Sequence, residues 1–216
     1  HKLKHAGAML VVSDDDTTYL KKHFPGKKVY YLPSFHANSE IRIPEGKGEY
    51  TLYHGNIEVP ENEAAAAFLI GKVFAGSVHK LIIAGMNPPQ RIIQLASRYK
   101  NISIIANPGD EELFSLIRNA HVNILVTFQA TGLKLKLLNT LYNGRHCLVN
   151  PPMLNGTGLD SMCHIASDPD ELLRKLDELK DKPFSHADAE ARKTVLGSAY
   201  SNALNADRLI GIVFGG

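Results

Sequence analysis

Short apolar runs recur along the chain and alternate with segments in which apolar residues return at helical spacing. Because each run is apolar at consecutive positions, we expect both faces of each strand to be buried, which is typical of a parallel sheet. The predicted strands cover residues 8–12, 28–32, 50–53, 80–84, 102–106, 122–127 and 146–149. The predicted helices cover residues 61–74, 89–99, 110–120, 133–143 and 170–180.

This alternation of strand and helix predicts an α/β fold with a doubly wound parallel sheet of the Rossmann-like type. In such sheets, ligands bind where the carboxyl ends of the strands turn into the following helices. The residues that follow the predicted strands are therefore the first candidates for a functional site.

The segment 35–49 interrupts the alternation, because it lacks a sustained apolar period and contains Pro44, Gly46 and Gly48. We interpret it as a linker. Residues 1–34 then form a strand–helix–strand remnant of a preceding domain, residues 50–182 the main domain, and residues 183–216 C-terminal helices that pack back on the body. The chain starts at His1, without an initiator methionine or a signal-peptide pattern, so we expect further sequence upstream.

Composition narrows the function classes. The formal charge is only +2, and no basic block with interleaved aromatic residues occurs, so nucleic acid is not an expected partner. No apolar run approaches the roughly 18 residues of a membrane helix. The two cysteines, Cys147 and Cys163, form no CxxC pattern, and the ten histidines show no metal-binding spacing. We expect a soluble, cytoplasmic protein without a bound metal or cofactor.

Several common sites are excluded by their missing motifs. No GxGxxG follows the first strand, and neither a GxxxxGK[ST] phosphate loop nor a GxSxG nucleophile elbow is present. The acidic run at residues 14–16 follows Ser13, and it is interpreted as the first turn of a helix that Ser13 caps rather than as a metal site.

Three turns after predicted strands combine glycine and asparagine. Gly55 and Asn56 follow the strand at 50–53, and the helix that begins near Pro60 offers unpaired N–H groups to an anion. Gly85 and Asn107 follow the next two strands. Each turn alone is equally typical of ordinary turn chemistry. Their expected position on one sheet edge is what makes them candidates.

The fourth turn carries the strongest signal. Thr131 and Gly132 precede a helix whose first turn holds Lys134 and Lys136. Cations at this end oppose the helix dipole, and an arriving anion relieves that conflict. A hydroxyl, a glycine and fresh helical N–H groups suit a diphosphate. Because the lysines lie two positions apart, they point to different helix faces, and we expect only one of them to touch the phosphates.

These turns together resemble the C-terminal, donor-binding half of a group 1 glycosyltransferase of the GT-B fold. The resemblance covers roughly residues 8–180 and rests on 53–56, 84–85, 107–108 and the run 131–149, in which a helix ends at Gly144 before a strand. Residues 1–34 resemble only the end of the family's N-terminal acceptor domain. The remainder of that domain, with the acceptor site, would lie upstream.

The resemblance implies a role for each matching position. The segment after Gly132, with Leu133, would cradle the diphosphate of the donor, and Asn139 would contact the ribose. Thr131 and Asn139 replace the two acids of the family's Glu-x7-Glu pattern, and Asn56 and Glu61 replace an Arg and a Lys that bind phosphate. The implied donor-site residues are Gly55, Asn56, Gly85, Asn107, Thr131, Gly132, Leu133, Lys134, Lys136 and Asn139.

The activity implied is transfer of a sugar, with retention, from a UDP- or GDP-type nucleotide sugar to an acceptor hydroxyl. The acceptor would be a saccharide or a lipid-linked molecule held by the N-terminal domain, and a lipid-linked acceptor would bring the full-length protein to the membrane periphery. The fragment alone would be inactive, and no catalytic residue is assigned. Two alternatives stay open, a nucleotide-sugar 2-epimerase and a non-catalytic binding module of the same fold.

Overall fold

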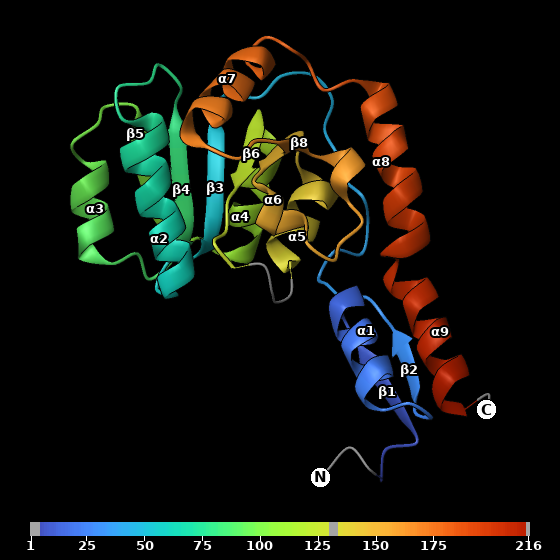
Figure 1. The fold of residues 1–216 in the computed structure, drawn as a ribbon. Coiled ribbons are helices and arrows are strands. Elements are labelled where there is room, and N and C mark those ends of the chain that lie inside the picture. Colours follow the sequence, from blue (N-terminus) through green and yellow to red (C-terminus); the bar gives the residue numbers. More distant parts are fainter. Residues whose placement is uncertain (1–4, 130–133, 215–216) are drawn as a thin grey trace.

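The computed structural model describes residues 5–129 and 134–214 of the 216-residue chain. Its main body is a six-stranded parallel sheet in the order β5-β4-β3-β6-β7-β8, and a separate pair of parallel strands, β1 and β2, lies near the N-terminus (Figure 1). The α/β fold predicted from the sequence is confirmed.

The strands are β1 (Ala8–Val11), β2 (Lys28–Tyr31), β3 (Thr51–Asn56), β4 (Leu81–Met86), β5 (Ile102–Ala106), β6 (Val122–Leu125), β7 (His146–Val149) and β8 (His164–Ile165). The helices are α1 (Asp14–His23), α2 (Pro60–Phe68), α3 (Gln90–Ala96), α4 (Asp110–Asn119), α5 (Leu135–Asn143), α6 (Pro151–Leu154), α7 (Pro169–Leu179), α8 (His186–Ala199) and α9 (Asn202–Phe214). A π-helix, η2 (Leu69–Phe74), continues α2, and a short 3-10 helix, η3 (Asp160–Met162), precedes β8.

Strand order reverses at β3, which pairs with β4 on one side and with β6 on the other. Consecutive crossovers run outward from β3 in one direction and from β6 in the other, as in a doubly wound sheet. A ligand site is expected beside such a switch point, outside the carboxyl ends of the two central strands.

Both faces of the sheet are covered, which explains why the strands are apolar at consecutive positions. Tyr53 packs on one face in the cluster shared with α2, η2, α3 and α7, whereas its neighbour Leu52 packs on the other face beside α4. A further cluster beside β6 and β7 joins Leu125 and Val149 to α5, α6 and α8. Successive side chains of a strand point to opposite faces, so a sheet covered on both faces needs apolar residues at every position.

Gly85 is required by the close packing of β3 and β4. The two strands pair in register, with Gly55 beside Gly85. A Cβ atom added to Gly85 would lie 1.8 Å from the carbonyl oxygen of Gly55. Any side chain at Gly85 would therefore push the ends of these two strands apart, exactly where the turns of the expected ligand edge begin.

The predicted elements differ from the observed ones in several places, and two of these differences have a clear physical reason. The helix predicted at 61–74 is α-helical only as far as Phe68, and from Leu69 to Phe74 it is a π-helix. Strand β8 was not predicted, because two residues are too few to form a hydrophobic pattern. The predicted cap is confirmed, since the Ser13 hydroxyl accepts a hydrogen bond from the Asp16 amide at 3.1 Å.

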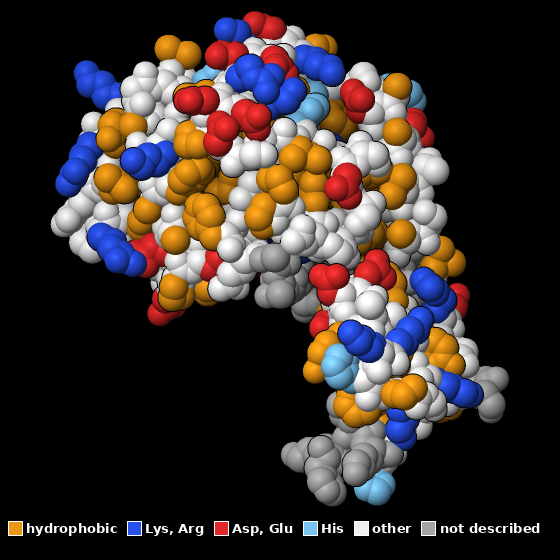
Figure 2. Space-filling model, in the orientation of Figure 1, with side chains coloured by type: hydrophobic (Ala, Val, Ile, Leu, Met, Phe, Trp, Pro, Cys, Tyr) orange, Lys and Arg blue, Asp and Glu red, His pale blue; other side chains and the backbone are white. Residues whose placement is uncertain are grey.

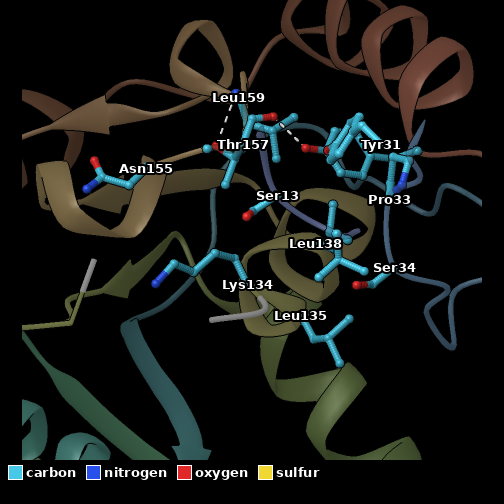
Figure 3. A pocket seen from close by; sticks show the side chains of 13 residues that line it. Ser13, Tyr31, Pro33, Ser34, Lys134, Leu135, Leu138, Asn155, Thr157 and Leu159 are labelled. Atoms are coloured by element: carbon cyan, nitrogen blue, oxygen red, sulfur yellow. Dashed lines mark hydrogen bonds between the residues drawn. The ribbon is translucent and has the colours of Figure 1, made fainter. Parts of the chain in front are cut away.

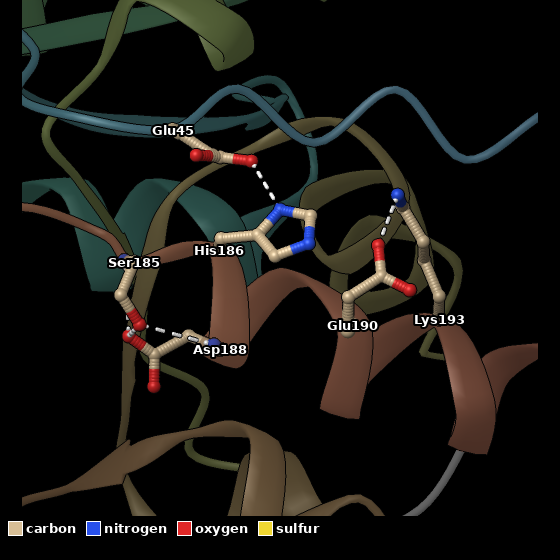
Figure 4. Close-up of polar contacts among 6 residues, drawn as sticks. All are labelled: Glu45, Ser185, His186, Asp188, Glu190 and Lys193. Atoms are coloured by element: carbon tan, nitrogen blue, oxygen red, sulfur yellow. Dashed lines mark hydrogen bonds and ion pairs between the residues drawn. The ribbon is translucent and has the colours of Figure 1, made fainter.

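The C-terminal helices link the main body to the β1–β2 unit (Figure 1). Helix α8 begins with a capping box, in which the Ser185 and Asp188 side chains each accept a bond from the other's backbone N–H (Figure 4). The Nδ1 atom of His186 lies within hydrogen-bond distance, 2.7 Å, of the Glu45 carboxylate in the linker (Figure 4). Asn202, at the start of α9, donates to the backbone oxygen of His36 at 2.7 Å. Among the described residues, no helix is both long and apolar enough to cross a bilayer.

The exposed surface of the main body is charged where α7 covers it (Figure 2). Arg174 and Lys175 both pair with Glu178 there, at 2.6 and 2.7 Å. Such exposed pairs add little stability, and they are typical of a solvated helix face. On the opposite side of the body, the surface is hollowed where it meets the β1–β2 unit (Figure 2).

Candidate functional site

The turns after β3, β4 and β5 lie together at the carboxyl edge of the sheet and are joined by hydrogen bonds. The Asn87 amide donates to Oδ1 of Asn107 at 2.7 Å, and its side-chain amide donates to Glu58 at 2.9 Å. Asn87 and Asn107 both have positive φ angles, 46° and 53°, a conformation that asparagine tolerates better than most residues. These bonds connect the three turns into one continuous edge.

Lys136 reaches across this edge from the first turn of α5. Its Nζ donates to Oδ1 of Asn62 on α2 at 2.5 Å and lies 5.5 Å from the ring centroid of Tyr53. Burial lowers the pKa of Lys136, and the nearby Glu61 carboxylate acts in the opposite direction. The ammonium group is thus partly withdrawn from water at the centre of the expected ligand edge.

Glu61 is held on the other side of the same space. Its carboxylate accepts a hydrogen bond from the Thr127 hydroxyl, at the end of β6. Thr127 is itself fixed by Asn150, which accepts from the Thr127 amide at 3.0 Å and donates to its carbonyl at 2.7 Å. In this chain the acid therefore lies on α2 and the lysine on α5, the reverse of what the sequence resemblance implies for the family.

His54 on β3 interacts electrostatically with Lys136 and is almost completely buried, with 2% of its surface exposed. Its Nε2 is 3.0 Å from the Thr140 hydroxyl on α5. Burial, followed by the charge of Lys136, lowers the pKa of His54 to about 3. The imidazole is therefore neutral at physiological pH, and its bond to Thr140 ties β3 to the helix that carries Lys136.

Lys134 lines a pocket between the main body and the β1–β2 unit, and its side chain extends away from Ser34 on the far wall (Figure 3). The volume of this interdomain pocket, including the part that is open to solvent, is about 450 Å³. It is lined by Val12, Ser13, Tyr31, Pro33, Ser34, Lys134, Leu135, Leu138, Asn155, Gly156, Thr157, Leu159 and Tyr200. The Lys134 ammonium donates to the Gln129 carbonyl at 3.2 Å, and burial lowers its pKa. Glu61 interacts electrostatically with Lys134 as well as with Lys136, so the separation expected from the spacing of the two lysines is only partial.

The interdomain pocket also contains an unsatisfied polar group. The hydroxyl of Ser34 is buried and has no hydrogen-bond partner within the described part of the chain. Gly156 and Gly158, in the loop on the opposite wall, have positive φ angles of 69° and 64°. A buried hydroxyl without a partner is uncommon in proteins, and here it lies just behind the wall of the pocket.

The structure brings some of the predicted site residues together and separates another. Gly55, Asn56, Gly85 and Asn107 share the carboxyl edge with Lys136. Asn139 does not face this edge, since its Oδ1 accepts from Asn38 of the linker at 3.0 Å. Residues Thr131, Gly132 and Leu133 lie outside the described residues.

Sequence reasoning missed the residues that fix the two sides of the edge. Asn62, Thr127 and Asn150 each hold a charged or backbone group in place, yet none belongs to a recognisable motif. Their only sequence signal is their position, at the start of a helix or the end of a strand. Among the described residues, no group of three His, Cys, Asp or Glu side chains could hold a metal ion.

Comparison with known proteins identifies the architecture. No protein-family profile and no curated protein sequence matches this chain. Similar solved structures include sucrose-phosphate synthase from Thermosynechococcus elongatus, with a TM-score of 0.70 and 15% identity over 99% of this chain and 60% of that one. They also include Staphylococcus aureus TarM in complex with fondaparinux, α-GlcNAc-glycerol and UDP, with a TM-score of 0.69 and 10% identity over 96% and 44%.

A glycosyltransferase from Rickettsia africae is similar as well, with a TM-score of 0.64 and 12% identity over 97% of this chain and 65% of that one. The chain therefore spans between 44% and 65% of the length of these three proteins. At such low identities the likeness concerns the fold. The chain shares the fold of the matching part of these GT-B glycosyltransferases.

Proposed function

We propose that this chain supplies the donor-binding half of a glycosyltransferase and binds the diphosphate of a nucleotide sugar at the start of α5. The observation that carries the proposal is the placement of Lys136, partly buried at the carboxyl edge of the sheet beside its switch point. The fold, shared with several glycosyltransferases, supports the same reading.

The energetics of the edge favour an anionic ligand. Lys136 lies in the first turn of α5, where its charge opposes the helix dipole, and burial costs it hydration. Glu61 offsets only part of this cost, because the pKa of Lys136 remains lowered by burial in spite of the nearby carboxylate. A diphosphate at the start of α5 would add opposite charge and would accept bonds from the helical N–H groups.

The same groups would serve the chemistry of transfer. As the bond between the sugar and the diphosphate breaks, negative charge grows on the departing phosphate. Lys136, held by Asn62, and Lys134, at the wall of the interdomain pocket, are the cations placed to stabilise that charge. The TarM structure holds UDP together with saccharides, which supports a nucleotide donor and a sugar acceptor for this chain too.

A binding panel tests the proposal. The chain is titrated with UDP, GDP and their glucose and mannose esters in a thermal-shift assay, with AMP as a control mononucleotide. We expect at least one diphosphate to raise the melting temperature in a concentration-dependent way, because a ligand that binds only the folded state stabilises it. If no diphosphate or nucleotide sugar stabilises the chain at millimolar concentration, the proposed donor site is wrong.

Product analysis distinguishes transfer from epimerisation. The bound nucleotide sugar is incubated with the protein as it is naturally expressed, with and without saccharide acceptors. A transferase releases nucleoside diphosphate and elongates the acceptor, whereas a 2-epimerase converts the nucleotide sugar without any acceptor. Binding with neither product would indicate a non-catalytic module.

A further inference from the structure

Cys147 and Cys163 are 16 positions apart in the sequence but lie side by side in the sheet. Strands β7 and β8 are parallel, with Leu148 beside His164. One step back along both strands brings Cys147 beside Cys163, whose backbone is still extended, with φ −124° and ψ 151°. Neighbouring strands are about 4.8 Å apart, which falls within the Cα separation that a disulfide accepts.

The two side chains also point to the same side of the sheet. Both belong to the apolar cluster beneath α5, α6 and α8, in which Cys147 is fully buried and Cys163 is partly buried. The pKa of the Cys147 thiol is raised, first by its hydrogen bond to Cys163 and then by burial. The strand register and the shared cluster therefore place the two side chains next to each other in the reduced protein.

Cys163 is the member of the pair that solvent can reach. It lines a pocket at the amino end of β7 and β8, together with His146, His164, Lys182 and Arg192. Of the residues that line this pocket, Lys182 and Arg192 are positively charged and Asp188 is negatively charged. Since Cys147 is buried, Cys163 is the sulfur that a small oxidant in solvent meets first.

Arg192 is buried near the cysteine pair and is held there by hydrogen bonds. Its guanidinium donates to the carbonyls of Gly144 at 2.7 Å and Arg145 at 2.8 Å and lies 4.5 Å from the ring centroid of Phe184. It interacts electrostatically with Cys147 and with Cys163. This buried cation is thus a fixed feature of the cysteine pair.

We propose that Cys147 and Cys163 form a reversible dithiol–disulfide pair that responds to peroxide. The Cys163 thiolate attacks hydrogen peroxide, the O–O bond breaks, and sulfenic acid and water result after proton uptake. The Cys147 sulfur then attacks the Cys163 sulfur, the S–O bond breaks, and a second water leaves. In total, two thiols and one peroxide give one disulfide and two waters, so that sulfur is oxidised and peroxide is reduced.

The bond would restrain a segment that reaches the interdomain pocket. Between the two cysteines lie α6 and the loop with Asn155, Gly156 and Thr157, which forms one wall of that pocket. A disulfide closes this stretch into a covalent loop and lowers its freedom to move. The inference rests on the cysteine geometry alone and does not depend on what the interdomain pocket binds.

Peroxide treatment followed by mass spectrometry tests the pair directly. The chain is exposed to hydrogen peroxide, denatured, alkylated at free thiols and weighed intact. We expect the loss of two hydrogens and of both alkylation sites, reversed by dithiothreitol, and a non-reduced digest should join the two cysteine peptides. Because the chain has only two cysteines, the assignment is unambiguous.

Single substitutions separate the roles of the two thiols. In Cys147→Ser, sulfenic acid should accumulate at Cys163 and react with dimedone, whereas in Cys163→Ser the buried Cys147 should stay reduced. Circular dichroism checks that both variants fold, and the experiment on the unaltered chain stands without them. The proposal is overturned if the unaltered chain keeps both thiols, gains only oxygen atoms, or forms only disulfides between chains.

Discussion

Acidification should destabilise the protein through His54, and the size of the effect follows from its burial. Burial lowers the pKa of the folded imidazole to about 3, whereas in the unfolded chain it titrates near its ordinary value of 6.5. Between these two values the unfolded chain binds the proton and the folded chain does not. Stability is therefore complete above pH 6.5 and is lost progressively as the pH falls towards 3.

The magnitude can be worked out for an accessible range. Lowering the pH from 7.5 to 5.0 protonates His54 in the unfolded state only, which removes about 2 kcal/mol from the free energy of unfolding. Other groups also titrate over this range, including His146, whose pKa burial lowers to about 4. A variant that lacks only the His54 titration is needed to isolate its share.

His54→Gln is that variant, because glutamine keeps a hydrogen-bonding group near Thr140 but does not titrate. Urea unfolding at pH 7.5 and 5.0 should show that the unaltered chain loses about 2 kcal/mol more than the variant. Equal losses in both proteins would refute the reasoning. If the variant does not fold, NMR titration of the imidazole in the unaltered chain gives the same answer, since His54 should show no shift change down to pH 5.

Two further substitutions test the packing of the sheet. Gly85→Ala should lower the free energy of unfolding by at least about 2 kcal/mol in urea, because the new methyl group would collide with the Gly55 carbonyl; Gly71→Ala, where nothing lies within 4 Å, should change it by less than about 1 kcal/mol. Asn101→Ala should lower the free energy of unfolding by about 1–3 kcal/mol in thermal unfolding, since the amide group of Asn101 donates to three backbone carbonyls at 3.0 Å. The matched change Asn119→Ala should be nearly neutral, because Asn119 is exposed. Equal effects within either matched pair would contradict the packing described here.

Much of the fold could be predicted from the sequence, because burial on both faces leaves a simple pattern. Strands β5 and β7 were predicted at their observed bounds. All four residues of β7 are buried, whereas in β5 only Ile102 is. The π-helix after Phe68 could not be predicted, because its spacing differs little from that of an α-helix over six residues. Strand β8 is specified by pairing with β7 rather than by its own two residues.

The candidate site was predictable only in outline. Turn residues such as Gly85 and Asn107 indicate a sheet edge, and Lys136 indicates an unusual helix start. The partners of Lys136 could not be predicted, because Asn62 lies 74 positions away and the contact depends on how α2 and α5 pack. Long-range contacts of this kind are products of tertiary structure.

For Asn139, in contrast, the sequence predicted a role that the structure does not show. The resemblance places it at the ribose, but in the structure its carboxamide bonds to Asn38, a residue of the linker. Asn143 donates to the same Asn38 side chain at 2.7 Å. A polar residue on a helix can serve a ligand or a neighbouring segment, and its sequence position does not distinguish the two. A ribose contact by Asn139 stays a prediction.

The most direct test of the central claim is the affinity of the chain for nucleoside diphosphate with and without Lys136. Isothermal titration of UDP and GDP is carried out on the unaltered chain, on Lys136→Met and on Lys72→Met, which removes an exposed lysine of η2. A charged hydrogen bond contributes about 1.5–3 kcal/mol, so Lys136→Met should bind the preferred diphosphate roughly 10- to 100-fold more weakly, and Lys72→Met should bind it normally. Equal affinity in all three proteins would contradict the proposed diphosphate site.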